Sequence, residues 1–464
     1  MSLSVGFISL GCAKNTVDAQ VMAGFLKKSG AVFAPSPEQA DVIVVNTCAF
    51  IRDAREESVE AVLQACEQKR RGACRAVIVT GCLSQRYREK LVATFPRVDA
   101  FLGVNDLEKA PEVLSAIESG TLRDVLKVSP SSPGKVYNPE YPSLLFTGAA
   151  FAYLKIAEGC DHGCTFCAIP GIRGRYRSRR PDDIVAEAKA LVEAGVKELD
   201  VVAQDTTRYG CDLKNGENLA GLLRRLDELP GDFRIRVLYA YPSAVSDELI
   251  EVLANGRKIC RYLDIPIQHC SEKILRAMGR ADEIAATKDI VQRLREAVPG
   301  IALRTTLMTG FPGETEKECG EMLDFIRNSR FDHLGIFAFS PEEGTKAMEL
   351  AKTVPMVSET IARRWRRMLM REHAAIVAER AKTELRGTYD RLLLASCNGE
   401  NGKGWLERQA PGVDGVTYVT HLSPSIKPGD LVEVRISGAK SYDLLAHASR
   451  KNAFDKNRVY RRKS

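Results

Sequence analysis

Three cysteines within eight residues have the types and spacing of a metal site. Cys160, Cys164 and Cys167 form a C-x3-C-x2-C run, called the barrel triplet below. Three thiolates can hold three irons of a cubane 4Fe-4S cluster, which leaves the fourth iron open to another molecule. A structural zinc site is the alternative, but such sites are usually closed by four ligands in paired C-x2-4-C units, and no second pair lies nearby. The run therefore predicts an iron–sulfur cluster with one open iron.

The barrel triplet follows a strand-like segment, 151–157, and so lies on the loop that leaves the carboxyl end of that strand. Enzymes built as barrels of parallel strands carry their catalytic groups on such loops. The spacing of the three cysteines resembles that of radical S-adenosylmethionine (SAM) enzymes. We therefore expect the triplet at the mouth of a barrel.

Three further cysteines, Cys12, Cys48 and Cys82, each follow a predicted strand and are called the N-terminal triplet below. They are spaced by about one βαβ unit, and loops at the carboxyl edge of a parallel sheet converge in space. Gly11 and Gly81 precede two of them and permit the tight turn that a bulky cluster near the backbone needs. Buried core cysteines are the alternative, because free cysteine is common in cores. We expect a second site with three thiolate ligands.

Composition limits the class of protein. The chain has 464 residues, enough for two to four domains. It contains no run of eighteen apolar residues and no signal-peptide pattern at its start, so we expect a cytoplasmic protein that makes no membrane contact. Thirteen cysteines, an odd number, in a reducing compartment indicate metal or thiol chemistry rather than disulfides.

The net charge of +7 is concentrated at the end of the chain. Residues 450–464 carry seven basic side chains against one acidic side chain, and the rest of the chain is close to neutral. A basic tail of this kind is often a solvated end, and it could also contact RNA weakly through phosphates.

The first part of the chain alternates strand-like and helical patterns, which predicts a parallel sheet covered by helices on both faces. The expected strands are 4–10, 41–46, 75–80 and, more weakly, 99–102. Between 127 and 147, segments rich in proline, serine and glycine can continue neither element. We place the first domain at 3–118 and a boundary after it.

The alternation resumes with longer units and predicts an open, partial (β/α)6 barrel at 146–378, two strand–helix pairs short of a closed eightfold barrel. The expected strands are 151–157, 198–203, 233–239, 262–267, 301–309 and 333–339. Helical patterns such as 181–194 and 315–328 lie between them.

A long arginine-rich helix, 358–384, then leads to short β-like runs punctuated by glycine. These runs are 389–397, 403–408, 415–421, 431–437 and 438–446. They predict a small five-stranded antiparallel β-barrel at 380–449, a type that often binds RNA or protein. The fold class is therefore α/β with a C-terminal β-barrel, followed by the tail at 450–464.

These three segments together resemble the radical SAM methylthiotransferase family, whose members insert sulfur and a methyl group at an unactivated carbon and end in a TRAM-like barrel. One subfamily modifies an adenosine of tRNA, and the other modifies an aspartate of small-subunit ribosomal protein twelve. Three motifs resemble the ribosomal-protein subfamily: SLGCAKNTVD at 9–18, QDT at 204–206 and YLDIPIQH at 262–269. A neutral third domain also suits a basic protein target better than a polyanion. The basic tail departs from the pattern.

The resemblance implies two 4Fe-4S clusters, with SAM as both radical source and methyl donor. The barrel triplet would hold the cluster whose open iron binds SAM, which is cleaved to methionine and a 5′-deoxyadenosyl radical that takes hydrogen from the aspartate β-carbon. The N-terminal triplet would hold an auxiliary cluster that presents sulfur to the substrate radical. No catalytic side chain is expected beyond the cluster ligands, because this chemistry belongs to the cofactors.

Polar or glycine-rich loops after the later barrel strands could hold SAM, whose ammonium, carboxylate and ribose need hydrogen-bonding partners. Glycine there would let the backbone approach the ligand closely. The candidate residues are Gln204, Asp205, Gln268, His269, Gly310, Gly313 and Glu314. Ordinary hydrogen-bonded loop ends are the alternative for the polar ones. The arginines at 173–180 could hold a carboxylate or face solvent.

The resemblance also implies partners: ribosomal protein twelve, free or on the ribosome, with a reductant and a sulfur donor. Two alternatives stay open, a tRNA adenosine methylthiotransferase and a non-catalytic iron–sulfur protein that binds RNA or serves in redox chemistry. Reductive SAM cleavage would be absent from the latter. A plain radical methyltransferase, in turn, would not need the N-terminal triplet.

Overall fold

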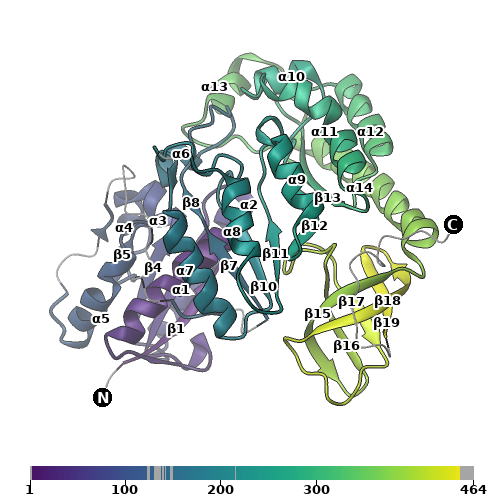
Figure 1. Cartoon of the computed structure of the whole chain (residues 1–464). Coiled ribbons are helices and arrows are strands. Elements are labelled where there is room, and N and C mark those ends of the chain that lie inside the picture. Colours follow the sequence, from purple (N-terminus) through teal and green to yellow (C-terminus); the bar gives the residue numbers. More distant parts are fainter. Residues whose placement is uncertain are drawn as a thin grey trace.

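The computed structural model describes residues 3–122, 126–129, 137, 141, 143–146, 150–214 and 216–449. Within them the chain forms two parallel sheets and a closed β-barrel (Figure 1). The basic tail and much of the predicted boundary region lie outside the described residues. No helix in this part of the chain is long and apolar enough to cross a membrane.

The first sheet has six parallel strands in the order β2-β1-β3-β4-β5-β6. The strands are β1 (Ser4–Ser9), β2 (Val32–Phe33), β3 (Val42–Thr47), β4 (Ala76–Gly81), β5 (Ala100–Leu102) and β6 (Leu126–Lys127). The helices around it are α1 (Ala13–Lys28), α2 (Arg52–Arg70), α3 (Cys82–Tyr87), α4 (Glu89–Thr94) and α5 (Ala110–Glu118). Strands β3 and β4 alternate their apolar side chains between a core under α1 and α5 and a core under α2 and α3. The predicted sheet with helices on both faces is confirmed.

The second sheet also has six parallel strands, in the order β14-β13-β12-β11-β10-β7, so β7 and β14 are its edges and the barrel stays open as predicted. The strands are β7 (Phe151–Lys155), β10 (Glu198–Val202), β11 (Arg234–Val237), β12 (Ile259–Asp264), β13 (Ala302–Thr309) and β14 (His333–Ala338). Its helices include α7 (Pro181–Glu193), α8 (Leu219–Asp227), α9 (Asp247–Asn255), α11 (Glu283–Ala297), α12 (Glu316–Ser329) and α14 (Glu359–Arg380). The fourth strand begins and ends about three residues earlier than predicted, and Pro266, which lacks a backbone N–H donor, keeps it from extending to residue 267.

The C-terminal barrel closes in the order β15-β16-β17-β19-β18. The strands are β15 (Tyr389–Asn398), β16 (Asn401–Leu406), β17 (Thr417–Thr420), β18 (Leu431–Lys440) and β19 (Asp443–Ala448). The expectation of a wholly antiparallel barrel is wrong at one pair, because β17 and β19 run parallel. A closed ring with an odd number of strands cannot alternate direction throughout, so one parallel pair is unavoidable.

The C-terminal barrel covers the amino ends of the second sheet, opposite the cysteine loop. The buried side chains of Arg234 and Arg236 cross this junction and donate to the carbonyl oxygens of Arg391 and Glu407, each at 2.7 Å. Glu198, also buried, accepts from both arginines and balances their charge. The third domain therefore closes one end of the open barrel and leaves the carboxyl end for chemistry.

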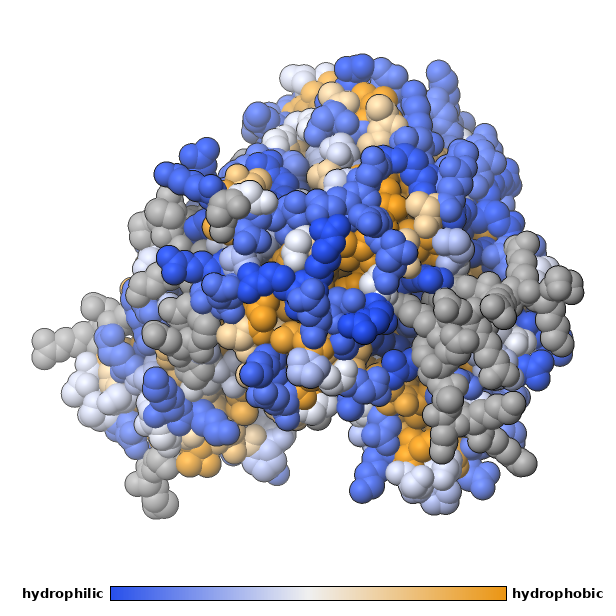
Figure 2. Space-filling view, viewed as in Figure 1, coloured by the Kyte–Doolittle hydropathy of each residue, from blue (hydrophilic) through white to orange (hydrophobic). Residues whose placement is uncertain are grey.

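The first sheet lies beside the second at its β7 edge (Figure 1). Helix α1 packs against β7, and α3 packs against α6 (Ile169–Arg173), the helix that follows the barrel triplet. In the same view the surface is mostly hydrophilic, with apolar surface near the centre of this face and on the C-terminal barrel (Figure 2). The two cysteine-bearing loop clusters are thus brought to one junction between the domains.

Candidate functional site

The barrel triplet lies on the loop after β7 and the short strand β8 (Ala157–Glu158), at the carboxyl edge of the second sheet. Gly159, with φ +81°, starts the turn, and a Cβ there would lie 2.2 Å from the carbonyl oxygen of Arg175. Only glycine fits this position without strain. Farther along, the backbone N–H of Thr165 donates to the carbonyl oxygen of Met278 at 2.9 Å. The loop is therefore constrained just before Cys160 and again between Cys164 and Cys167.

The three cysteines of the barrel triplet are partly buried and lie close enough for their charges to interact. Burial raises the pKa of Cys160 to about 11 and that of Cys167 to about 12, and the charge of neighbouring thiols adds to both shifts. Burial also raises the pKa of Cys164, whose Sγ lies 3.9 Å from the guanidinium of Arg280. A metal ligand must be a thiolate, and this buried cation is placed to balance the charge that metal binding would bring.

His162, inside the cysteine run, is engaged by other side chains. Its Nε2 lies 2.6 Å from Oδ2 of Asp205, and its ring stacks on Tyr241 with centroids 3.8 Å apart. The guanidinium of Arg280 lies 4.2 Å from the same tyrosine ring. The other carboxylate oxygen of Asp205 accepts from the backbone and hydroxyl of Thr207. These contacts fix the cysteine loop against the ends of β10 and β11.

The N-terminal triplet lies at the carboxyl edge of the first sheet, and its thiols are near neighbours. A Cβ on Gly11 would lie 2.8 Å from the Cβ of Cys48. The thiol of Cys82 lies 3.5 Å from Oδ1 of Asn15. Burial raises the pKa of Cys82 to about 12; the charge of Arg173 opposes this shift, and the charges of Cys48 and Cys12 contribute to it. The predicted convergence of these loops is therefore present in the fold.

Asn15 ties the three loops of this edge together. Its Nδ2 donates to the carbonyl oxygens of Leu10 at 3.0 Å and Thr47 at 2.9 Å. Its own carbonyl oxygen accepts from Nδ2 of Asn46 at 2.7 Å. Gly81 is equally constrained, because a Cβ there would lie 2.5 Å from the carbonyl oxygen of Thr47. At both predicted glycine positions, Gly11 and Gly81, a side chain would collide with neighbouring atoms.

No three His, Cys, Asp or Glu side chains in the described ranges are arranged to hold a single metal ion. A cubane cluster places one thiolate on each of several irons, so its ligands need not point at one atom.

Arg173 links the two cysteine sites. It is 1% exposed, and its Nη2 donates to Oδ1 of Asn15 at 2.7 Å, to Oδ2 of Asp18 at 2.9 Å and to Sγ of Cys82 at 3.4 Å. Its Nη1 lies 3.1 Å from both carboxylate oxygens of Glu158, which stands two residues before the barrel triplet. One buried guanidinium therefore contacts the N-terminal site and the base of the cysteine loop.

A second buried cation completes this network. Nζ of Lys155 donates to Asp18 and to Glu158, each at 2.7 Å, and Nε2 of Gln204 donates to Glu158 at 2.8 Å. The negative charges of the carboxylates balance the positive charges of the cations in a region closed to solvent. No sequence pattern predicted this pairing; the arginines at 173–180 were expected only to hold a carboxylate or to face solvent. Arg175, by contrast, has a side chain that is 89% exposed.

The structure places the predicted SAM-binding residues in two settings. Oε1 of Gln204 is buried and lacks a partner among the described residues, so it is free to accept from a ligand. Gln268 has φ +74°, and its backbone N–H donates to the carbonyl oxygen of Thr306 on β13. Gly310 and Gly313 both have positive φ, as a tight turn requires.

His269 and Glu314 are buried rather than exposed on the loops. Each is at most 2% exposed, and Nε2 of His269 lies 3.5 Å from Oε1 of Glu314. Oε2 of Glu314 accepts from the backbone N–H groups of Gly310 and Phe311. These two residues shape the glycine turn from beneath.

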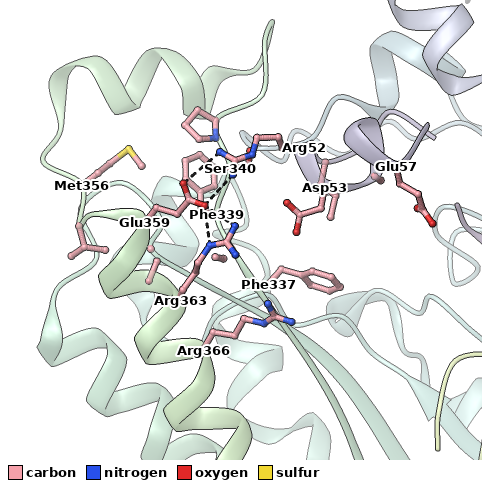
Figure 3. Close-up of a pocket in the computed structure, with 17 residues that line it drawn as sticks. Arg52, Asp53, Glu57, Phe337, Phe339, Ser340, Met356, Glu359, Arg363 and Arg366 are labelled. Atoms are coloured by element: carbon pink, nitrogen blue, oxygen red, sulfur yellow. Dashed lines mark hydrogen bonds and ion pairs between the residues drawn. The ribbon is translucent and has the colours of Figure 1, made fainter. Parts of the chain in front are cut away.

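A cavity of about 530 Å³ opens between the start of α2, the carboxyl ends of β13 and β14, and the start of α14 (Figure 3). Gly310 lines it, which connects it to the predicted SAM-binding turn. Arg52 of α2 pairs with Glu359 of α14 across it at 3.1 Å. No sequence pattern predicted this cavity, since it forms only where the domains meet.

Models of known families match three separate segments. Residues 4–103 match an uncharacterized protein family, UPF0004; residues 154–326 match the radical SAM superfamily; and residues 395–448 match the TRAM domain.

Curated relatives match nearly the whole chain. A protein of Syntrophus aciditrophicus named ribosomal protein uS12 methylthiotransferase RimO is 43% identical over 96% of this chain and 98% of its own length. Proteins of the same name from Symbiobacterium thermophilum and Geobacter sulfurreducens are 44% and 41% identical, covering 96% and 95% of this chain and 91% and 97% of their own.

Solved structures share the fold at low identity. The radical SAM methyltransferase TsrM of Kitasatospora setae, bound to cobalamin and a 4Fe-4S cluster, aligns with a TM-score of 0.52 at 17% identity, over 73% of this chain and 75% of its own. The cobalamin-dependent radical SAM enzyme OxsB aligns with a TM-score of 0.51 at 13% identity, over 83% of this chain and 62% of its own.

Proposed function

This chain belongs to the family of ribosomal protein uS12 methylthiotransferases, and on that premise we propose how its own residues serve the reaction on uS12. It is a radical SAM enzyme that uses SAM and iron–sulfur chemistry. The observation that carries the assignment is the identity of more than 40% with three relatives of this name over nearly the full chain.

We assign one 4Fe-4S cluster to each triplet, two in all. The donor sets fit: each has three thiols on loops at a carboxyl edge, and a buried cation beside them, Arg280 at one site and Arg173 at the other. Gly11 and Gly81 leave space where a side chain would intrude on the N-terminal site. When bound, the clusters and SAM supply the electron that cleaves SAM and the sulfur and methyl group that are transferred.

The contribution of the chain itself is positioning. Arg173, Lys155, Asp18 and Glu158 form a balanced buried network between the two loops, so the two cysteine sites are held at a fixed separation. Because the side chains of this network are buried and hydrogen-bonded, the groups that they position do not need to reorganise during the reaction. The C-terminal barrel keeps solvent from the opposite end of the open barrel.

SAM binding is assigned to the loops after β10, β12 and β13. Gln204 offers a buried acceptor, Oε1, that has no partner among the described residues, and Asp205 is held beside the cysteine loop by His162. The glycine turn at 310–313 presents backbone, and the buried pair of His269 and Glu314 supports that turn. Gln268 starts the loop next to it.

Several further assignments rest on the family rather than on contacts. We propose domain limits of 3–118, 146–378 and 380–449, with the tail at 450–464 making weak RNA contact on the ribosome. The reaction needs a reductant and a sulfur donor, and we infer a cytoplasmic enzyme because the relatives are named for a ribosomal protein substrate.

The test compares cells with and without the gene. Intact mass of uS12 and nucleoside analysis of tRNA are measured in both. Loss of about 46 Da, a methylthio group in place of hydrogen, from uS12 alone supports the proposal. Loss of methylthioadenosine from tRNA instead would assign the chain to the other subfamily, and no change in either would favour a non-catalytic iron–sulfur protein.

A further inference from the structure

The cavity between the domains has a net basic wall on α14, where Glu359 accompanies two arginines, and a net acidic wall on α2, where Arg52 accompanies two carboxylates (Figure 3). Helix α14 contributes Arg363 and Arg366, and the first turn of α2 contributes Asp53, whose carboxylate points toward them. Phe337 of the edge strand β14 lies between the walls and is 45% exposed, and Met356 is 36% exposed at the side. Charges of both signs around apolar surface suit a polypeptide, whereas a polyanion such as RNA would meet repulsion at the acidic wall.

Two of these charges have no partner within the described ranges. Arg366 and Asp53 make neither a hydrogen bond nor an ion pair there. Neighbouring charges of the cavity are paired: Glu359 pairs with Arg363 on the same helix and with Arg52 across the cavity. The paired residues are exposed, and an exposed ion pair costs little to open. Glu57, on the next turn of α2, also lines the cavity and makes no ion pair within the described ranges, so the cavity offers one unpaired cation on α14 and two unpaired anions on α2.

The cavity also borders loops at the carboxyl edges of the two sheets. Ile51, at its edge, stands three residues after Cys48 on the same loop. Gly310 and Phe339, on the other side, follow β13 and β14 at the carboxyl edge that also carries the barrel triplet. A chain segment bound here would lie beside the loop that carries Cys48 and at the edge of the second sheet that also carries the barrel triplet.

We propose that this cavity binds the segment of uS12 that carries the aspartate to be modified, an inference that rests on the proposed function. Arg366 binds a carboxylate of that segment, Asp53 binds a basic side chain near it, and Phe337 packs against its apolar part. The Arg52–Glu359 pair opens to admit the segment.

The experiment measures methylthiolation of purified uS12 by the reconstituted full-length enzyme as a function of uS12 concentration. The variants are R366E and D53K, with R366K as the conservative change. R367E is the matched control, because Arg367 is exposed on the same helix and does not line the cavity. Iron content and melting temperature are compared across all variants to show that each is folded and loaded.

We expect R366E and D53K to raise the KM for uS12 by about tenfold or more, equal to about 1.4 kcal/mol of lost binding, with a smaller effect on kcat. R366K should recover most of the affinity, and R367E should match the wild type. If R366E has the KM of R367E while the wild type modifies uS12, the cavity assignment is overturned and the proposed function stands. If the wild type leaves uS12 unmodified, the proposed function fails and the cavity assignment fails with it.

Discussion

Nη2 of Arg173 lies 3.4 Å from Sγ of Cys82, although the two residues belong to different sheets. The same guanidinium binds Glu158 at the base of the cysteine loop of the second sheet. A hydrogen bond to a cluster sulfur is one of the factors that set reduction potential. Arg173 is therefore positioned both to join the domains and to influence whatever metal Cys82 binds.

Replacing Arg173 should destabilise the protein and lower the midpoint potential of the N-terminal cluster. R173Q leaves Glu158 and Asp18 buried with Lys155 as their only cation, and breaking a buried ion network of this kind costs about 3–5 kcal/mol. We also expect a lower midpoint potential for the N-terminal cluster, because a donor to its ligand sulfur is lost. Denaturant unfolding and a redox titration followed by electron paramagnetic resonance measure the two effects.

R173K keeps the positive charge but lacks the forked guanidinium geometry. Its stability and its midpoint potential should therefore lie between those of the wild type and R173Q. Arg175 is exposed, and R175Q is the control that should change neither property. Equal potentials in the wild type and R173Q would contradict the assignment of Arg173 to the N-terminal site.

Gly81→Ala should remove metal from the N-terminal site alone. Gly81 has φ +95°, and a Cβ there would lie 2.5 Å from both Oδ1 of Asn46 and the carbonyl oxygen of Thr47. The loop that carries Cys82 must then move. Iron analysis should show about half the iron of the wild type, since only the barrel triplet would remain intact.

Gly30→Ala is the matched control for this substitution. Gly30 also has positive φ, +92°, but nothing lies within 4 Å of its added Cβ. It should cost about 1–2 kcal/mol of stability from backbone strain and leave the iron content unchanged. Equal iron in G81A and the wild type would show that this turn does not shape a metal site.

The two triplets should have separable roles. Cys48→Ala should abolish methylthiolation of uS12 while 5′-deoxyadenosine is still formed from SAM, and Cys164→Ala should abolish both, since the radical is generated at the barrel cluster. Liquid chromatography with mass detection measures both products. Cys211 is an exposed free cysteine, and C211A should behave as the wild type. Full methylthiolation by C48A would remove the N-terminal triplet from the mechanism.

Stability should fall in mild acid because of one buried histidine. Burial lowers the pKa of His373 to about 4, although a hydrogen bond with the carbonyl oxygen of Phe331 opposes the shift. The folded state therefore keeps the neutral ring, and its contribution is complete above the unfolded pKa near 6.5. As pH falls from about 6.5 to 4, up to about 3 kcal/mol is lost.

Denaturant unfolding at several pH values measures this effect. H373Q should lose stability at neutral pH but show a shallower decline with acid. His421 is exposed, so H421Q should follow the wild type at every pH. A decline in H373Q as steep as that of the wild type would assign the acid sensitivity to other groups.

The residues that sequence analysis found are those whose position depends on one sheet. Cys12, Cys48 and Cys82 could be placed together because parallel strands deliver their loops to one edge. Arg173 and the cavity at Asp53 and Arg366 depend on how two domains pack, and neither periodicity nor spacing carries that information. Strands β2 and β6 were missed because two residues are too few to show a period.

The most direct measurement is the intact mass of purified uS12 after incubation with the reconstituted enzyme, SAM, sulfide and a low-potential reductant. We expect a gain of about 46 Da that maps to one aspartate and that is absent when Cys48 is replaced by alanine. An unchanged mass of uS12, with methylthiolation of tRNA in a parallel reaction, would contradict it.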